Sequence, residues 1–272
     1  MTICIAAVCG RGSVLVMASD RMLTSSALSI QFEHASRKFT PLSEGCVALT
    51  AGDALAHTEL FDAVRDEIAK IKAPSVPQVV ETIKECYQSI RRKEIEERIL
   101  RPKGINSLAE YLQVQRSLVT EIAFNFQSQI DNYDYGLEVL VGGVNGDVAR
   151  IFGISNPGTS ECYDAIGFHS IGSGLPHALN TLIARGCHRD ISLAQCLLTV
   201  YEAKKMAEKA PGVGATITDI CVVDSSGIYE FPQNGLDQLR ESHERWIKQE
   251  SEWDKSVNAL LAKKEEWKHE AS

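Results

Sequence analysis

Strand-like and helix-like patterns occur in blocks along this chain, and the order of the blocks constrains the fold more than any other feature. Apolar and β-branched runs predict strands at residues 3–8, 14–20 and 45–51. Apolar residues at helical spacing then predict helices between about 55 and 130. A second group of strands, two more helices and a last strand pair follow. Grouping of this kind favours antiparallel sheets covered by helices over alternating parallel β-α units.

Turn signals set the boundaries inside the blocks. The Gly-Arg-Gly turn at 10–12 makes the first two strands a hairpin, and the Asn-Gly pair at 145–146 predicts another. The Pro-Lys-Gly turn at 102–104 precedes a helix predicted over 105–130. The later predicted elements are strands at 137–143, 148–153 and 161–166, helices at 175–184 and 192–207, and strands at 216–223 and 227–231.

These patterns predict two parts of unequal size. We interpret residues 1–233 as one α+β domain, a four-layer α/β/β/α sandwich of antiparallel sheets, to which 105–130 adds an extra helix. Residues 234–272 are predicted to form an amphipathic helical extension. Its apolar residues recur every seven positions, at Leu239, Trp246, Trp253, Leu260 and Trp267. So narrow a stripe fits a seam along a partner surface, or packing of the extension back on its own domain.

Composition excludes several classes of function. The net charge is -8, which argues against nucleic acid as the main partner because phosphate binding needs clustered basic residues. The basic run 91–93 is followed directly by glutamates, so we expect a solvated face of mixed charge. The eight cysteines form no CxxC pair and suit buried thiols in a reducing compartment. Dispersed histidines predict no metal or cofactor, and no run suits a signal peptide or a membrane span, so we expect a cytoplasmic protein.

The start of the chain carries the first candidate for chemistry. Initiator Met1 is normally removed before a small residue, which would leave Thr2 with a free α-amine. An α-amine with a pKa of about 7.7–8.0 can act as general base for the adjacent hydroxyl. Thr2 also leads directly into the predicted strand at 3–8, whereas chain termini are usually frayed. The alternative is that Thr2 is an ordinary second residue.

Further candidates follow predicted strands. Asp20 ends the second strand and should return close to Thr2, and Lys38 could meet Asp20 and stabilise an alkoxide on the threonine. Gly52 could offer a backbone N–H to an oxyanion before a helix that Asp53 would cap. Ser173, between two glycines, is either a proton relay or a helix cap. The simpler alternatives are an ion pair at a strand end and an ordinary strand-to-helix turn.

Together these segments resemble the proteasome β-subunit family of N-terminal-nucleophile hydrolases, and most of all its simpler bacterial homologues without a propeptide. The resemblance covers residues 2–231 and depends on the order of six segments. They are Thr2 before the first strand, Ser19-Asp20-Arg21, Arg37-Lys38-Phe39, Ala51-Gly52-Asp53, the strand with Gly142-Gly143, and Gly172-Ser173-Gly174.

The resemblance implies a threonine-type endopeptidase that assembles into homo-oligomeric stacked rings around a chamber. Thr2 would be nucleophile and, through its amine, base; Lys38 would lower the hydroxyl pKa and Asp20 would orient Lys38. Gly52 would form the oxyanion hole, and Ser173 would support proton transfer. Peptides or unfolded proteins would be the substrates, an ATP-dependent unfoldase is a further partner that the resemblance admits, and neither nucleic acid nor membrane is implied.

Three departures from the family pattern leave alternatives open. The spacings from Thr2 to Asp20 and from Asp20 to Lys38 are slightly longer than usual. An Asp and a Ser that the family often carries before its last strand pair are replaced by residues 210–214, Ala-Pro-Gly-Val-Gly. The helix at 105–130 and the tail have no counterpart in the minimal family. The alternatives are a catalytically silent ring or scaffold subunit, and an amidase that acts on a small molecule.

Overall fold

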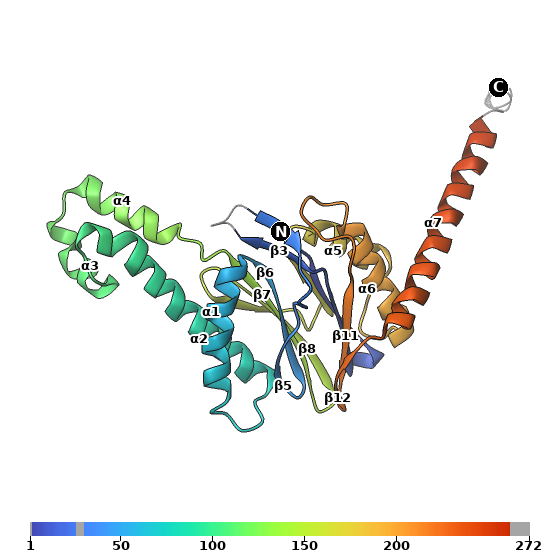
Figure 1. The fold of residues 1–272 in the computed structure, drawn as a ribbon, viewed down its shortest axis with the longest axis horizontal. Helices are drawn as coiled ribbons and strands as arrows, with labels where there is room; N and C mark the ends of the chain where they lie inside the picture. Colours follow the sequence, from blue (N-terminus) through green and yellow to red (C-terminus); the bar gives the residue numbers. More distant parts are fainter. Residues whose placement is uncertain (1, 26–29, 262–272) are drawn as a thin grey trace. The chain divides into compact units, whose positions relative to one another are not determined.

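The computed structural model describes residues 2–25 and 30–261 (Figure 1). The chain divides into two compact units, Met1–Glu230 and Phe231–Ser272. In the described part of the chain, no helix is both long enough and apolar enough to cross a bilayer. The larger unit is a mixed α+β structure in which all neighbouring strands of the main sheets are antiparallel, as the block order predicted.

One five-stranded sheet joins the beginning of the chain to residues two hundred positions later. Across the sheet its strands are β10 (Phe168–Ile171), β1 (Cys4–Cys9), β2 (Val14–Ser19), β11 (Asp219–Asp224) and β12 (Gly227–Glu230). The inner strand β1 is buried along its whole length. Because β1 lies between β2 and β10, the residue just before it is held inside the sheet instead of fraying.

A second five-stranded sheet lies against the first. Its strands are β5 (Thr40–Ser43), β6 (Cys46–Gly52), β7 (Leu137–Asn145), β8 (Val148–Ser155) and β9 (Thr159–Cys162), and β3 (Met22–Ser25) pairs with β4 (Ile30–Glu33) in a separate ribbon. Leu15 and Met17 of the first sheet share one buried cluster with Leu140 of the second. A side chain at Gly142 would start only 2.5 Å from Leu15 and 2.8 Å from Met17, so this glycine lets the sheets approach closely.

Helices cover the outer face of each sheet (Figure 1). The second sheet shares a core with α1 (Ala54–Ile68) and α2 (Val76–Ile95), and the first sheet contacts α5 (Leu175–Ala184) and α6 (Leu193–Ala207). Helix α1 begins at Asp53, whose side chain accepts a hydrogen bond of 2.9 Å from the Leu55 N–H. Seven of the eight cysteines are buried thiols, as expected, and Cys162 is exposed.

Most predicted strands are confirmed, and the short ones were missed. The β1–β2 hairpin and the β7–β8 hairpin form as expected, the latter with Gly146 at a φ of 59°. The strand expected at 161–166 lies slightly earlier, as β9. The ribbon β3–β4 and strands β5 and β10 were not predicted. Each of them has only four residues, and unlike β12, which the turn after β11 marks, none of them is paired with a longer predicted strand through a recognised turn.

The prediction of one continuous helix over 105–130 is wrong. Helix α2 runs through a π-helical turn and a 3-10 turn to Gly104, and the chain then forms α3 (Leu108–Val114) and α4 (Thr120–Asp131). Between them Leu118 and Val119 are extended, with ψ of 150° and 136°. The Ser117 hydroxyl donates to the Val114 carbonyl at 2.6 Å, which competes with continuation of the helix.

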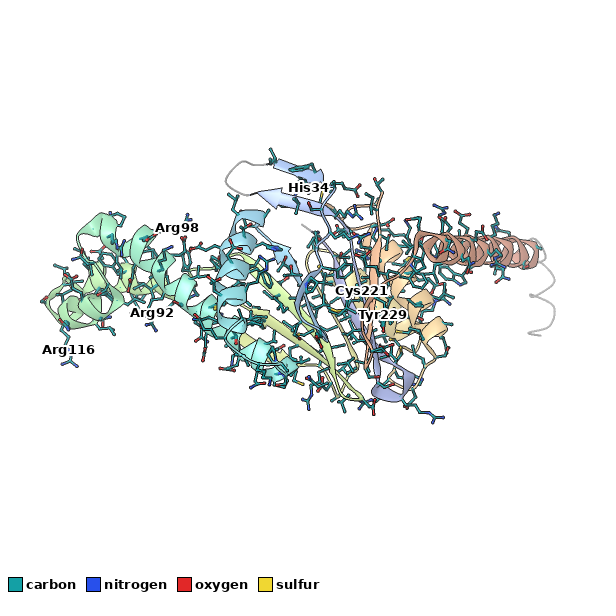
Figure 2. All side chains as sticks on the ribbon, turned by 60° about the horizontal axis from the view of Figure 1, so that its bottom comes forward. His34, Arg92, Arg98, Arg116, Cys221 and Tyr229 are labelled. Carbon is teal, nitrogen blue, oxygen red and sulfur yellow. The ribbon has the colours of Figure 1, made fainter. Side chains whose placement is uncertain are left out.

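The helical insertion, which consists of α3 and α4, shares a small core with the end of α2. This core includes Ile95, Tyr111 and Phe126. Figure 2 labels three arginines of this region: Arg92 on α2, Arg98 on the π-helical turn that follows it, and Arg116 on the turn after α3. Arg92 and Lys93 are exposed, as expected of a solvated face. Arg91 is not, because its guanidinium donates to the carbonyls of Ile130 and Tyr133 and to the Asn156 side chain, at 3.0–3.3 Å. The basic run is therefore only partly a solvated face.

The smaller unit contains one long helix, α7 (Gln233–Leu261). Leu239 and Trp246 of the seven-residue stripe lie on it, and Trp267 lies outside the described residues. Two interpretations of the stripe stay predictions: that it lies along a partner surface, and that it packs back on the larger unit.

Candidate active site

The antiparallel register of β1 and β2 brings Thr2 to Asp20. Cys4 pairs with Ser19 across the hairpin, so the residues just outside the ladder, Ile3 and Asp20, are neighbours. The Asp20 N–H donates to the Ile3 carbonyl at 3.3 Å, and the Ile3 N–H donates to Asp20 Oδ1 at 3.4 Å. A residue two positions before the strand pairing therefore faces the carboxylate that ends the next strand.

Thr2, Asp20 and Lys38 form a buried hydrogen-bonded cluster. The Thr2 hydroxyl donates to Asp20 Oδ1 and accepts from the ammonium of Lys38, which also lies 2.5 Å from Asp20 Oδ1. The exposed fractions of the three residues are 2%, 0% and 5%. A buried ammonium on a hydroxyl oxygen stabilises the oxygen as its proton leaves, and the paired carboxylate keeps the ammonium in place.

The segment at 210–214, Ala-Pro-Gly-Val-Gly, also contacts the cluster. The Gly214 N–H donates to Asp20 Oδ2 at 2.7 Å. A side chain at Gly214 would start 3.3 Å from the Asp20 Cβ and 2.4 Å from Glu33 Oε1, so glycine lets the backbone lie close to both carboxyl groups. A backbone donor thus occupies a place where side-chain partners were expected, and sequence patterns gave no signal for it.

The glycines around Ser173 enclose Thr2 from the other side. Gly172 has a φ of 95°, and a side chain there would start 2.4 Å from the Thr2 carbonyl oxygen. The Ser173 hydroxyl is 3.5 Å from the same oxygen and 3.4 Å from the Pro211 carbonyl, and the Gly174 N–H is 3.4 Å from Thr2 O. Gly174, not Ser173, is the N-cap residue of α5. Ser173 is therefore bonded to the Thr2 backbone rather than used as a helix cap.

Gly52 ends β6 beside Thr2 in a conformation that requires glycine. Its φ is 128°, and a Cβ atom would lie 2.1 Å from the Gly136 carbonyl oxygen. Asp53, the next residue, caps α1 as predicted. The backbone at Gly52 can approach a ligand closely, which is the property that an oxyanion donor needs.

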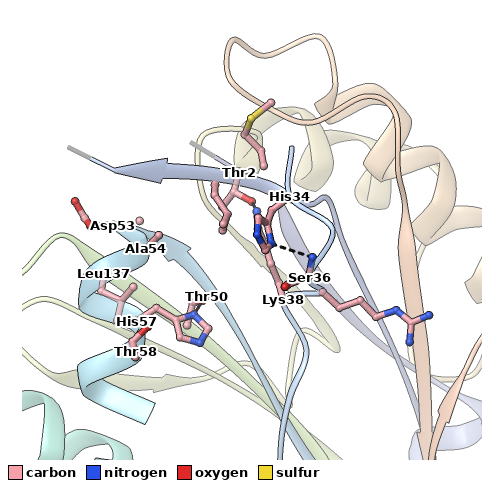
Figure 3. Close-up of a pocket in the computed structure, with 14 residues that line it drawn as sticks. Thr2, His34, Ser36, Lys38, Thr50, Asp53, Ala54, His57, Thr58 and Leu137 are labelled. Atoms are coloured by element: carbon pink, nitrogen blue, oxygen red, sulfur yellow. Dashed lines mark hydrogen bonds between the residues drawn. The ribbon is translucent and has the colours of Figure 1, made fainter. Parts of the chain in front are cut away.

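Thr2 lies between two cavities, and Gly52 lines both. The first, of about 260 Å³, extends along Lys38 and the start of α1 (Figure 3). The second, of about 510 Å³, extends along Glu138 and Ser173. Glu138 Oε2 accepts from the Gly172 N–H at 3.0 Å. A substrate that spans both cavities would pass over the Thr2 hydroxyl.

Two histidines in the first cavity were missed by the sequence analysis (Figure 3). His57 Nδ1 lies 2.8 Å from the Thr50 hydroxyl, and burial, with a smaller contribution from Arg65, lowers the His57 pKa. His34 Nδ1 accepts a hydrogen bond of 2.9 Å from the Ser36 N–H. Neither histidine has a partner at a recognisable sequence spacing; His57 could have been found only from its place four residues after the α1 cap.

The cysteine beside the cluster is not a second nucleophile. Burial raises the pKa of Cys4 to about 12, with Lys38 opposing that shift, so the thiol is protonated near neutral pH. Among the described residues, no group of three or more His, Cys, Asp or Glu side chains is arranged to hold a metal ion. The arrangement suits nucleophilic attack by a hydroxyl that a lysine and a carboxylate activate.

Comparison with known proteins adds no assignment: no family model matches the sequence, and no curated protein is significantly similar to it.

Proposed function

We propose that this chain is a proteasome-type N-terminal-nucleophile hydrolase, a threonine-type endopeptidase whose nucleophile is Thr2 after loss of Met1. The observation that carries the proposal is the position of the Thr2 hydroxyl, buried between the Lys38 ammonium and the Asp20 carboxylate just before an inner strand of the first sheet. Two facing antiparallel sheets with helices outside support the further proposal of a four-layer α/β/β/α sandwich.

The proposed reaction begins at the free amine that Met1 removal would create. The amine takes the hydroxyl proton while Thr2 Oγ1 attacks the scissile carbonyl carbon, and Lys38 stabilises the developing charge on Oγ1. The Gly52 N–H would bind the substrate oxyanion. The C–N bond then breaks, the leaving nitrogen takes the proton from the amine, and an ester on Thr2 remains. Water, deprotonated by the same amine, hydrolyses the ester and restores Thr2.

Assembly and location are part of the same proposal. A family member of this kind would form homo-oligomeric rings in the cytoplasm, enclose its sites in a chamber and receive peptides or unfolded proteins, with an ATP-dependent unfoldase as a further partner. The silent-subunit alternative was motivated by the changed segment at 210–214, and the Gly214 N–H on Asp20 now counts against it. The small-molecule amidase shares the same nucleophile, and native mass separates it, since a small oligomer rather than a ring would favour it.

Intact mass after incubation with a peptidyl epoxyketone tests the nucleophile. The probe needs a hydroxyl and a free amine on one residue, so we expect one adduct per chain, on protein that lacks Met1 and mapped to Thr2. The matched control is Thr24→Ser, because Thr24 lines the second cavity but not the cluster and should leave labelling unchanged. Thr2→Ala should abolish labelling. Retention of Met1, or absence of an adduct on processed protein, would refute the proposal.

A further inference from the structure

Lys204 is a buried cation that the proposed reaction does not use. It lies on α6, and its side chain is 0% exposed. Its ammonium donates to the Gly214 carbonyl at 3.0 Å and to Glu208 Oε1 at 2.6 Å. Burial lowers the pKa of Lys204, and the Glu208 carboxylate opposes that shift. A fully buried lysine costs free energy unless it is paired, so its position calls for a physical account.

Gly214 connects Lys204 to the candidate site. Its carbonyl accepts from Lys204, and its N–H donates to Asp20 Oδ2 at 2.7 Å. Asp20 in turn bonds both the Lys38 ammonium and the Thr2 hydroxyl. Lys204 therefore holds the carbonyl of the same residue whose N–H holds the second oxygen of Asp20, and the Lys204 charge interacts favourably with the Asp20 carboxylate.

We infer that Lys204 is a positioning residue for the Thr2 nucleophile, which acts through Gly214 to orient Asp20 and adds positive charge behind the cluster. This inference rests on the proposed function. The charged and titratable groups that face Asp20 and Lys204 from neighbouring elements are Lys38, Cys4, Glu33, Lys205 and Glu208.

The chain contains a matched control for this role. Lys205 follows Lys204 directly and donates to the same carboxylate, Glu208, at 2.8 Å. The Lys205 side chain is 26% exposed and has no bond to Gly214 among the interactions of the described residues. Lys204→Met and Lys205→Met therefore remove the same charge from adjacent positions, but only the first removes the contact with Gly214.

The test measures the second-order rate of Thr2 modification by the epoxyketone across pH 6–9, on full-length protein whose melting temperature and native mass are known. We expect Lys204→Met to react about tenfold more slowly at neutral pH, the size expected for one lost positioning hydrogen bond. The pH midpoint of its rate should move upward, because a lost positive charge makes the protonated amine of Thr2 more stable. Lys205→Met should keep the wild-type rate. A purely structural role would lower the melting temperature without moving the midpoint.

A second variant covers the case in which Lys204→Met does not fold. Glu208→Gln keeps the bond from Lys204 to Gly214 and removes its counter-charge, so the midpoint should move downward. The inference is overturned if Lys204→Met keeps the wild-type rate and midpoint, if both variants move the midpoint in the same direction, or if Lys205→Met loses as much rate as Lys204→Met. Where Lys204→Met does not fold, a Glu208→Gln midpoint that stays at the wild-type value or moves upward overturns it. A wild-type chain that never reacts overturns the proposed function together with this inference, whereas a reactive wild type with an unaffected Lys204→Met overturns the inference alone.

Discussion

Lys38→Met tests the energy stored in the buried cluster independently of any reaction. The Lys38 ammonium lies 2.5 Å from Asp20, and the two side chains are 6% and 0% exposed. Removing the ammonium leaves a buried carboxylate without its counter-charge, which costs about 3–5 kcal/mol. The N–H groups of Gly214 and Ile3 still bond Asp20, so we expect the lower end of that range.

The loss should be visible in chemical and thermal unfolding. For a chain of this size, about 3 kcal/mol corresponds to a fall in melting temperature of roughly 6–12 °C. The control is Lys70→Met, which breaks a pair with Glu67 at 2.7 Å between side chains that are 65% and 52% exposed. Such a surface pair is worth at most about 1 kcal/mol.

A double variant separates lost charge balance from lost packing. Asp20→Asn combined with Lys38→Met keeps an acceptor for the Gly214 N–H and removes both charges of the Asp20–Lys38 pair. We expect it to be more stable than Lys38→Met alone. The reasoning is refuted if Lys38→Met loses no more stability than Lys70→Met, or if the second substitution adds to the loss.

Three further predictions concern other parts of the larger unit. Burial lowers the pKa of His169 from 6.5 to about 4, so the unfolded chain binds a proton at this histidine first as pH falls. Stability should therefore drop between pH 7 and 5 by at most about 2 kcal/mol, because the ring is only partly buried and water screens the effect. His169→Phe should remove that drop in denaturant titrations at the two pH values. Gly52→Ala should lower the free energy of unfolding far more than Gly146→Ala in the same assay. A Cβ atom at Gly52 would lie 2.1 Å from the Gly136 carbonyl oxygen, whereas nothing lies within 4 Å of a Cβ atom at Gly146. Equal losses would contradict this. One thiol per native chain, Cys162, should react rapidly with a thiol reagent, and fast labelling that survives Cys162→Ser would disprove the burial of the others.

The sequence predicted those parts of the site that local pairing determines. An alternating hairpin places Asp20 beside Thr2 because the register of two adjacent strands follows from the turn between them. The glycine at 52 and the cap at Asp53 were predictable for the same reason, since a strand-to-helix turn has few solutions. The predicted break between α2 and the insertion likewise follows from the turn at Gly104, whose φ is 82°.

The remaining parts depend on contacts between distant segments. Gly214 meets Asp20 from 194 positions away in the sequence and is held in turn by Lys204, and neither residue belongs to a recognisable motif. A backbone N–H donor has no side-chain signature. The interruption at Leu118 was also hidden, because apolar residues keep helical spacing on both sides of it while the Ser117 side chain bonds the backbone locally.

The distance along the chain between the parts of the cluster has a consequence for biosynthesis. A ribosome completes Thr2, Asp20 and Lys38 early, but the groups that hold them, Ser173 and Gly214, emerge much later. During most of translation the N-terminal residue therefore has no partner from β10 or from the segment before β11. If Thr2 is the nucleophile, as proposed, a nascent chain would carry it without the groups that position it, because the complete cluster would form only when nearly all of the larger unit has left the exit tunnel.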